Sequence, residues 1–162
     1  MNRAEQRCYD AAESFAEYVP TIPVGDRNKR GRQFEDTLAV AMDSVGLRYK
    51  RNQTVSSKCA DMDFLIETGD VVYGVQCKAS VRERWRQADR DFLVAEEHYR
   101  LQGRKFIGIL LTMGEGREWT DADTRLHRRL QGRLLADGLV IVGSWNKLAL
   151  GYFLWKAKEM QG

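Results

Sequence analysis

The stretch that decides the fold spans residues 62–79 and reads MDFLIETGDVVYGVQCKA. Its two halves, residues 62–67 and 71–79, are rich in β-branched and aromatic side chains, and the turn formers Thr68-Gly69-Asp70 lie between them. This pattern predicts two antiparallel strands joined by a tight hairpin. Residues 47–55, just upstream, have a similar composition, so we expect three antiparallel strands in a row.

The hairpin is expected to bring an acidic, an amide and a basic side chain together. Gln76 and Lys78 are two residues apart on a strand, so their side chains point to one face of the sheet, while Val75 and Cys77 point to the other. The turn returns this strand alongside Asp63. A carboxylate and a lysine within an otherwise apolar hairpin are costly to desolvate unless they pair or bind a ligand.

Two interpretations of this cluster are open. In the first, Asp63 and Lys78 form a simple ion pair at a strand edge. In the second, hard oxygen ligands hold Mg²⁺, which prefers carboxylate, carbonyl and water oxygens. The ligands would be Asp63, the amide oxygen of Gln76, the backbone carbonyl of Cys77 and, through water, Glu35. Lys78 would then lie beside an attacking water and a scissile phosphate.

Helical patterns precede the three strands. Residues 3–18 have apolar side chains at helical spacing, and the prolines that follow end the helix. A polar connector over residues 25–32 is expected to lead into a second helix that holds Glu35 near its start and ends at Gly46. The apolar stripe of this second helix consists of Phe34, Leu38, Ala41, Met42 and Val45.

Alternating helices and strands follow the hairpin. The apolar spacing predicts a helix over residues 85–103, and residues 106–111 form a short apolar run typical of a strand covered on both faces. Residues 120–138 have the pattern of a capped helix, residues 139–145 that of a strand, and residues 148–155 that of a final strand or helix. This order predicts an α/β fold with a mixed sheet flanked by helices.

Composition limits the class of protein. With 162 residues, 43% hydrophobic and 30% charged, the chain is expected to form a single domain over residues 1–162 that is neither disordered nor collagen-like. No apolar run is long enough for a membrane span and residues 1–7 lack a signal-peptide core, so we expect an intracellular, cytoplasmic protein. Three cysteines without CxxC spacing and two histidines support neither a disulfide framework nor a zinc site.

The basic residues are biased toward arginine. Lys and Arg total 26 against 23 Asp and Glu, and the net charge of +3 is too small to indicate a nucleic-acid partner by itself. However, 18 of the 26 basic residues are Arg, whose planar guanidinium binds phosphates and guanine edges in a bidentate way.

With these residues in place, the sequence resembles the PD-(D/E)XK nuclease superfamily, which has the restriction-endonuclease-like fold, over about residues 31–111. In that family an αβββαβ core presents a helix glutamate, an aspartate at the start of one strand and an (E/Q)xK triplet on the next strand. The matching positions here are Glu35, Asp63 and Gln76-Cys77-Lys78. The chain departs from the usual pattern at Met62, where the family has proline, and at Gln76, where glutamate is usual and a neutral amide should weaken metal affinity.

The resemblance leaves one choice of ligand open and defines two additions to the core. Asp61 is an alternative metal ligand to Asp63, because it lies two residues earlier and so on the same face of the strand. We prefer Asp63 because an apolar run follows it directly, as in the family's strand. The helix over residues 3–18 and the segment over residues 120–162 lie outside the family core.

A basic segment follows the lysine. Arg82, Arg86 and Arg90 recur every four residues and share a helix face, which is either a solvated face neutralised by nearby acids or a surface that binds DNA. Residues 78–87 also resemble the K-x₃-(K/R)-(D/E)-R-W-R-Q segment of EcoRII-like type II restriction endonucleases. Together with two arginines that precede Glu35, the candidates for DNA contact are Arg82, Glu83 and Arg84 for base readout, Arg86 for phosphate or base, Arg90, Arg30 and Arg32.

The resemblance implies a Mg²⁺-dependent DNA endonuclease, with Mn²⁺ as a substitute metal, that acts on double-stranded DNA. A sequence-specific restriction-type enzyme is our first hypothesis. The alternatives are a homing endonuclease of the Q-x-K type, a Holliday junction resolvase or repair nuclease, and a catalytically inactive DNA-binding module. A double-strand cut needs two sites, so we expect a homodimer or higher symmetric oligomer in a prokaryotic or phage-like context, with a cognate methyltransferase as a partner of a restriction enzyme.

Overall fold

The computed structural model describes residues 1–78, 85–113, 139–143 and 147–162.

The start and the end of the first helix are explained by the residues that flank it. Helix α1 spans Arg3–Tyr18, as predicted. The side-chain oxygen of Asn2 caps it by accepting a hydrogen bond from the backbone N–H of Glu5 at 2.8 Å. A short 3-10 helix, Val19–Thr21, contains Pro20 and separates α1 from the next helix.

Helix α2, Arg27–Ser44, begins earlier than expected. The prediction of a connector over residues 25–32 is wrong beyond Asp26, because the Asp26 carboxylate caps a helix by accepting from the backbone N–H of Asn28 at 2.9 Å. The first turns of α2 are polar and mostly exposed, so they gave no apolar periodicity from which to predict a helix. Gly46 was expected to end this helix. Its φ of +73° is the left-handed conformation that glycine adopts just after a helix.

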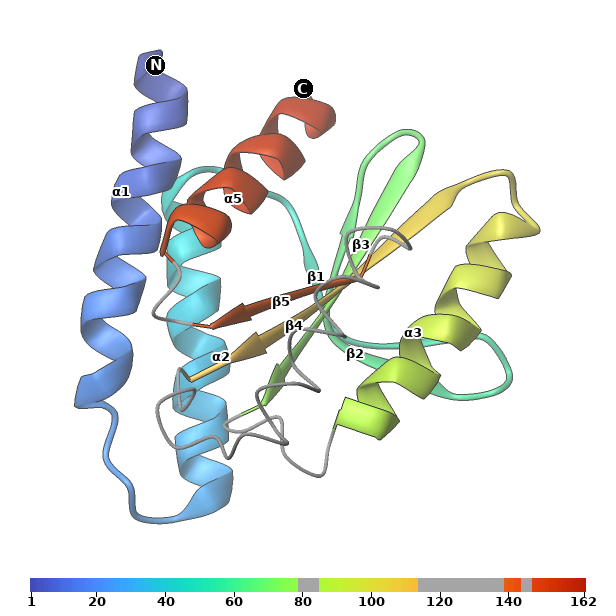
Figure 1. The fold of residues 1–162 in the computed structure, drawn as a ribbon, viewed down its shortest axis with the longest axis horizontal. Helices are drawn as coiled ribbons and strands as arrows, with labels where there is room; N and C mark the ends of the chain where they lie inside the picture. Colours follow the sequence, from blue (N-terminus) through green and yellow to red (C-terminus); the bar gives the residue numbers. More distant parts are fainter. Residues whose placement is uncertain (79–84, 114–138, 144–146) are drawn as a thin grey trace, which may run out of the picture.

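The predicted hairpin belongs to a mixed sheet (Figure 1). In the described part of the chain, five strands lie in the order β1-β2-β3-β4-β5. The first three are antiparallel neighbours, as predicted, and both β3/β4 and β4/β5 are parallel. Helix α3, Trp85–Arg100, makes the crossover from β3 to β4. The strands are β1 (Lys50–Val55), β2 (Ala60–Glu67), β3 (Val71–Lys78), β4 (Lys105–Thr112) and β5 (Leu139–Gly143).

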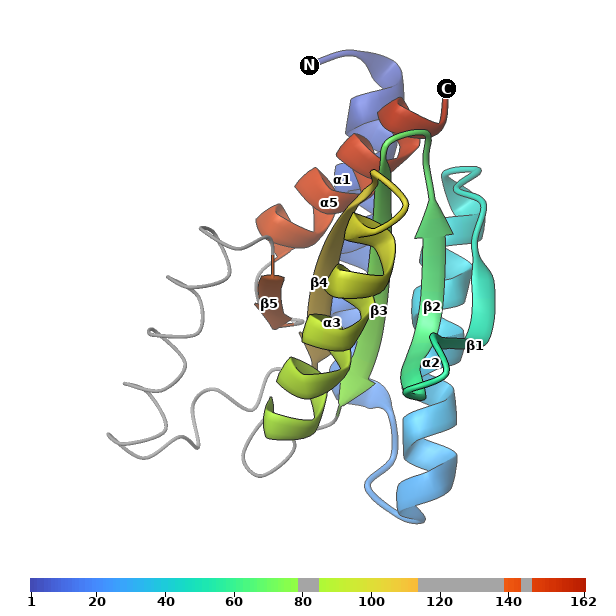
Figure 2. The ribbon, with the colours of Figure 1, turned by 90° about the vertical axis from the view of Figure 1, so that its right-hand side faces the viewer.

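Helices cover both faces of the sheet (Figures 1 and 2). On one face, residues such as Leu38 of α2 and Phe64 of β2 are buried together with parts of α1 and of α5, Lys147–Gln161. On the other face, Met62 of β2 and Phe92 of α3 belong to a second buried cluster. The prediction of an α/β fold with a mixed sheet flanked by helices is confirmed. The site described below lies at the ends of β2 and β3, between the two layers.

The C-terminal segment, which the sequence left open between strand and helix, is helix α5. Gln161 fastens its end to the sheet, because its amide nitrogen donates to the backbone oxygen of Arg48 at 2.7 Å and its amide oxygen accepts from the Arg48 N–H at 3.0 Å. The helix predicted over residues 120–138 lies outside the described residues. Within the described ranges, no helix has the length and apolar character needed to cross a membrane.

Candidate active site

The two strands of the β2/β3 hairpin separate near their open end. The paired register ends at Phe64 and Val75. Beyond this pair, the carboxylate oxygen Oδ2 of Asp63 accepts a hydrogen bond from the backbone N–H of Cys77 at 2.7 Å. The Cys77 N–H therefore donates to the Asp63 side chain and not to a backbone carbonyl of β2, and the Asp63 carboxylate is held between the two strands.

The backbone around Asp63 is irregular. Met62 packs in the cluster under α3, whereas Phe64, two residues later, packs on the α2 side of the sheet. Regular alternation would put both on one face. Asn52, which lies opposite Asp63 between the paired positions of β1 and β2, has a φ of +52°. This irregularity coincides with the point where the Asp63 side chain bonds to β3.

Asp63 and Glu35 form an acidic pair. Glu35 lies on α2 and is half-buried; burial raises the pKa of its carboxyl above the ordinary value, and the neighbouring Asp63 raises it further. Burial also raises the pKa of Asp63, while the Cys77 N–H and the charges of Lys78 and Arg51 offset part of that rise. The Asp63 charge thus disfavours ionisation of Glu35, and a cation close to these two partly desolvated carboxyls would stabilise their charged forms.

Lys78 is the last residue of β3 and is half-buried. Its charge lowers the pKa of both Glu35 and Asp63, so its ammonium group lies within electrostatic reach of both carboxyls. Among the ion pairs of the described residues, none joins Lys78 directly to Asp63. The simple ion pair, the first of the two interpretations of this cluster, is therefore not what the described residues form.

Gln76 is turned away from solvent toward α3. Its side chain is buried, and Nε2 donates to the backbone oxygen of Asp61 at 2.7 Å and to Oδ2 of Asp91 at 2.9 Å. The other carboxylate oxygen of Asp91 accepts from Gln87 at 3.0 Å and from Arg90 at 3.1 Å. The side chain of Gln76 thus joins β3, β2 and α3 in one hydrogen-bonded network.

Sequence reasoning missed Asp91, although a signal was present. Asp91 is only 4% exposed. It lies within the apolar stripe of α3 that includes Ala88, Phe92 and Ala95, at the spacing of residues that share a helix face. An acid on a buried helix face needs a partner, so this position could have been recognised as part of a polar network.

Arg51 on β1 is a second residue that sequence reasoning missed. Its guanidinium pairs with Asp36 at 2.9 Å, approaches Glu35 at 4.0 Å and lies over the Phe64 ring, 5.2 Å from the centroid. Arg51 and Phe64 are register partners, so cross-strand pairing explains the contact. The positive charge lowers the pKa of both Glu35 and Asp63. Only the register of β1 on β2, which the sequence pattern does not specify, brings Arg51 here.

The structure separates the two rival aspartates. Asp61 is exposed, and its Oδ1 accepts from the hydroxyl of Thr54 across the β1/β2 pair at 2.9 Å. Asp63 is half-buried and bonded to the Cys77 N–H, as described above. The Asp61 side chain is thus engaged on β1, whereas the Asp63 side chain points toward the triplet Gln76-Cys77-Lys78.

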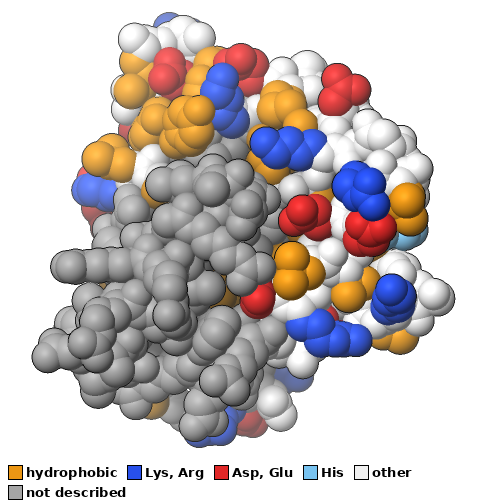
Figure 3. Space-filling view, turned by 45° about the vertical axis from the view of Figure 1, so that its right-hand side comes forward, with side chains coloured by type: hydrophobic (Ala, Val, Ile, Leu, Met, Phe, Trp, Pro, Cys, Tyr) orange, Lys and Arg blue, Asp and Glu red, His pale blue; other side chains and the backbone are white. Residues whose placement is uncertain are grey.

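The residues proposed for DNA contact are placed only in part. Arg82, Glu83 and Arg84 lie outside the described residues, and Arg86 is in the first turn of α3. Arg90 is exposed and donates to the backbone oxygen of Lys58 at 3.3 Å, which ties α3 to the β1/β2 turn. On the described part of the face in Figure 3, basic and acidic side chains are interspersed. On α2, Arg30 and Arg32 lie five and three residues before Glu35; Arg30 is half-buried and Arg32 is exposed.

The oxygen donors of this site suit a hard cation. The residues that the structure describes contain no group of three His, Cys, Asp or Glu side chains arranged to hold a metal ion. The candidate donors are the carboxyl of Asp63 and the amide oxygen of Gln76 on the hairpin, and the carboxyl of Glu35 on α2. Oε1 of Gln76 is buried and has no hydrogen-bond partner among the described residues. A buried oxygen without a donor costs free energy, and carboxylate and amide oxygens are ligands that Mg²⁺ prefers, so the residues fit this ion.

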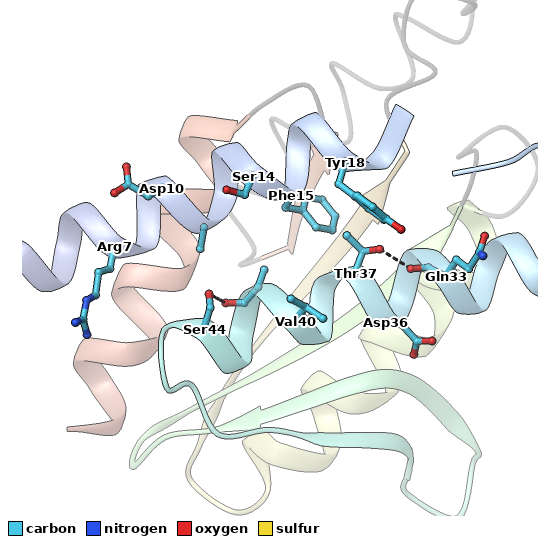
Figure 4. A pocket seen from close by; sticks show the side chains of 12 residues that line it. Arg7, Asp10, Ser14, Phe15, Tyr18, Gln33, Asp36, Thr37, Val40 and Ser44 are labelled. Atoms are coloured by element: carbon cyan, nitrogen blue, oxygen red, sulfur yellow. Dashed lines mark hydrogen bonds between the residues drawn. The ribbon is translucent and has the colours of Figure 1, made fainter. Parts of the chain in front are cut away.

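A separate groove of about 1030 Å³ lies between α1 and α2 (Figure 4). Its apolar lining includes Phe15, Tyr18 and Val40. The hydroxyls of Thr37 and Ser44, which also line it, donate to backbone oxygens of their own helix. The residues of the β2/β3 hairpin do not line this groove, so it is not part of the candidate active site.

Comparison with known proteins supports the fold. No model of a known protein family matches the chain, and neither does any curated protein sequence. Among solved structures, the chain is similar to the small subunit of the heterodimeric restriction endonuclease R.BspD6I, with a TM-score of 0.58 and 11% sequence identity. The similarity covers 91% of this chain and 81% of that one. The fold is therefore restriction-endonuclease-like, and the low identity transfers no residue roles.

Proposed function

We propose that the protein is a metal-dependent DNA endonuclease that hydrolyses phosphodiester bonds. The observation that supports this most directly is the hydrogen bond from the Cys77 N–H to Asp63, which fixes a half-buried carboxylate beside the triplet Gln76-Cys77-Lys78. Glu35 adds a second carboxyl from α2. The fold agrees with this proposal, and the neighbour with the same fold is a subunit of a restriction endonuclease.

The metal proposed for the site is Mg²⁺, with Mn²⁺ as a substitute. Its ligands would be Asp63, the amide oxygen of Gln76 and the backbone carbonyl of Cys77, with Glu35 reached through water. When bound, such a metal ion activates water and stabilises the charge that develops on the phosphate. The neutral amide of Gln76 supplies less charge than a glutamate would, so we expect weaker metal binding than at a site with three carboxylates.

The side chains then have distinct roles. The Lys78 ammonium donates hydrogen bonds to the attacking water and to a phosphate oxygen, and so orients the one and offsets the charge of the other. The charge of Asp63 disfavours ionisation of Glu35 until a cation is present, which couples the ionisation of Glu35 to metal binding. Attack on phosphorus leaves a 5′-phosphate and a 3′-hydroxyl, as the family resemblance implies.

Sequence specificity is a further part of the proposal. The segment from Lys78 to Gln87 resembles that of EcoRII-like enzymes, and α3 presents its first turn next to the end of β3 (Figure 1). Arg82, Glu83 and Arg84 would read base pairs, with Arg86 and Arg90 on the same helix face. A cut through both strands needs two sites, so the proposed form is a symmetric homodimer. A cognate methyltransferase would protect host DNA if the enzyme is a restriction enzyme.

An inactive DNA-binding module is the second candidate. The observation that favours it is that a neutral amide, hydrogen-bonded to Asp61 and Asp91, stands at the position of Gln76, where the family usually has an acidic ligand. This module would retain salt-sensitive DNA binding and show no metal-dependent cleavage. A homing endonuclease and a junction resolvase use the same chemistry and differ in substrate, so the choice of DNA distinguishes them.

Cleavage in the presence of Mg²⁺ is the experiment that tests the proposal. We expect the purified protein to cut mixed-sequence plasmid and phage DNA with Mg²⁺ and not with EDTA. Lys78→Ala should lower the cleavage rate roughly 10³-fold, because the only ammonium proposed to act on the water and phosphate is removed. Lys105→Ala, an exposed lysine at the far end of the neighbouring strand, is the matched control and should cleave normally.

The fragments and their ends distinguish the classes of nuclease. Discrete fragments at short symmetric sites indicate a restriction enzyme, whereas one or two long sites indicate a homing enzyme. Cleavage confined to four-way junctions indicates a resolvase. DNA binding without cleavage of any of these substrates would reject the enzyme and leave the binding module.

DNA binding by α2 gives a separate prediction. Arg32 is exposed near the N-terminus of α2, which has no acidic residue in its first turn. We expect Arg32→Gln to weaken binding uniformly across sequences and to lower the slope of log Kd against log salt by about one, as the loss of one phosphate contact does. Arg100→Gln at the far end of α3, where Arg100 pairs with Glu97, should leave the slope unchanged. Fluorescence anisotropy at several salt concentrations measures both, and equal slopes for wild type and Arg32→Gln would remove α2 from the interface.

A further inference from the structure

The amide group of Gln76 has its two hydrogens committed. One is donated to the backbone oxygen of Asp61 at 2.7 Å and the other to Oδ2 of Asp91 at 2.9 Å. An amide NH₂ has two hydrogens to donate, so the nitrogen is saturated. The amide oxygen, Oε1, must then point away from both partners.

The orientation of this amide does not depend on an arbitrary choice between nitrogen and oxygen. A backbone carbonyl accepts hydrogen bonds and cannot donate them, so the group that faces the Asp61 oxygen must be the nitrogen. The Asp91 carboxylate imposes the same choice from α3. Rotation of the amide by 180° would place two oxygens against Oε1 and leave the nitrogen without an acceptor.

Asp91 is itself held in place. It is only 4% exposed, and its second oxygen accepts from Gln87 one helical turn earlier and from the neighbouring Arg90. Arg90 in turn donates to the backbone oxygen of Lys58 in the β1/β2 turn. Contacts on α3 and on the hairpin therefore fix the carboxylate that fixes the Gln76 amide.

The oxygen that this arrangement leaves over is the unusual feature. Oε1 of Gln76 is buried and has no hydrogen-bond partner among the described residues. A buried oxygen without a donor is unfavourable unless a ligand fills its coordination. Because both amide hydrogens are donated, Gln76 offers one acceptor oxygen and no further donor. This oxygen can bind a cation, whereas a ligand that only accepts hydrogen bonds cannot bind to it.

We propose that Asp91 is a positioning residue that holds the Gln76 amide with its oxygen presented to the metal ion. This inference rests on the proposed function, since it assigns a task to a residue of the same site. Asp91 acts through Gln76 and does not itself bind the metal. The arrangement explains how a neutral glutamine serves at a position where a carboxylate, with two equivalent oxygens, would need no such orientation.

Mn²⁺ affinity in the absence of DNA tests the role of Asp91, because it requires no cleavage. Free Mn²⁺ is measured by electron paramagnetic resonance during titration of the full-length protein. We expect Asp91→Ala to weaken Mn²⁺ binding about tenfold, the usual effect of removing a group that orients a ligand. Asp91→Asn keeps one oxygen that can accept from Gln76 Nε2 but turns an NH₂ group toward the Gln87 and Arg90 donors, so its Mn²⁺ affinity should lie between those of Asp91→Ala and wild type.

A double-mutant cycle separates positioning from direct ligation. If Asp91 acts through Gln76, then Gln76→Ala and the double variant Gln76→Ala with Asp91→Ala should bind Mn²⁺ equally. Additive losses in the double variant would show that Asp91 is itself a ligand and overturn the inference. Thermal melts of each variant without metal identify those that do not fold, and the same cycle with Asp91→Asn replaces the one with Asp91→Ala if Asp91→Ala is one of them.

The outcomes for this inference and for the proposed function are distinct. If the wild type binds Mn²⁺ and Asp91→Ala binds it with the same affinity, the positioning role of Asp91 is contradicted and the nuclease proposal is unaffected. Wild-type protein that binds no Mn²⁺ at millimolar concentration contradicts the metal site and, with it, the positioning role.

Discussion

Asp63→Asn should abolish DNA cleavage and at the same time stabilise the folded protein at neutral pH. The loss of activity is expected to be on the order of 10³-fold or more, because the substitution removes the charge of the proposed central metal ligand. The gain in stability follows from the environment of Asp63, whose pKa is raised chiefly by burial. Asparagine keeps the oxygen that accepts from the Cys77 N–H, so the hydrogen bond of 2.7 Å should be retained.

The sign of the stability change depends on pH. The carboxyl of Asp63 loses its proton at a higher pH in the folded than in the unfolded protein, since burial raises its folded pKa. As pH rises from the ordinary carboxyl range through the folded pKa, the unfolded state is increasingly favoured and stability is lost. Asparagine does not titrate. The free energy of unfolding of Asp63→Asn should therefore exceed that of wild type at pH 7 and approach it below the ordinary carboxyl range.

Urea unfolding at pH 3.5 and pH 7, together with cleavage assays, measures both effects. Asp61→Asn is the control, because it removes a similar charge two residues away on an exposed side chain bonded to Thr54. We expect it to retain cleavage within several-fold. If Asp61→Asn abolishes cleavage and Asp63→Asn does not, the assignment of the metal ligand is reversed.

The order of elements could be predicted because local patterns determine it. The periodicity of α1, the β-forming runs of the hairpin and the turn Thr68-Gly69-Asp70 each depend on residues close in sequence. The proximity of Asp63 to the triplet at 76–78 follows from the same hairpin, since a tight turn fixes which residues face each other. The polar start of α2 was missed because a cap and exposed polar turns give no apolar period.

The second half of the site depends on tertiary packing. Asp91 reaches Gln76 only because α3 packs on the sheet at a particular height, and Arg51 reaches Glu35 only through the register of β1. Neither distance can be read from spacing along the chain. The roles of Arg82, Glu83 and Arg84 in base readout remain predictions, because these residues lie outside the described part of the chain.

The height of α3 above the sheet is set by a pair of glycines. Gly74 on β3 and Gly108 on β4 are register partners in the parallel pair. A Cβ at Gly108 would lie 2.5 Å from the Phe92 ring, and one at Gly74 would lie 2.5 Å from the Phe106 ring. The two rings therefore occupy the space that side chains at these positions would take. Phe92 is the residue next to Asp91, so this packing also sets the position of the carboxylate that holds Gln76.

Gly108→Val should accordingly destabilise the protein by about 3 kcal/mol, the upper range for adding atoms to a packed core, and should weaken Mn²⁺ binding through displacement of Asp91. Urea unfolding and the Mn²⁺ titration measure the two effects. Gly31→Ala is the control, because a Cβ there meets nothing within 4 Å and replacing glycine within α2 should stabilise the helix by up to about 1 kcal/mol. A Gly108→Val protein as stable as wild type would mean that Phe92 does not rest on Gly108. The height of α3, and with it the contact between Asp91 and Gln76, would then be set by residues other than this glycine.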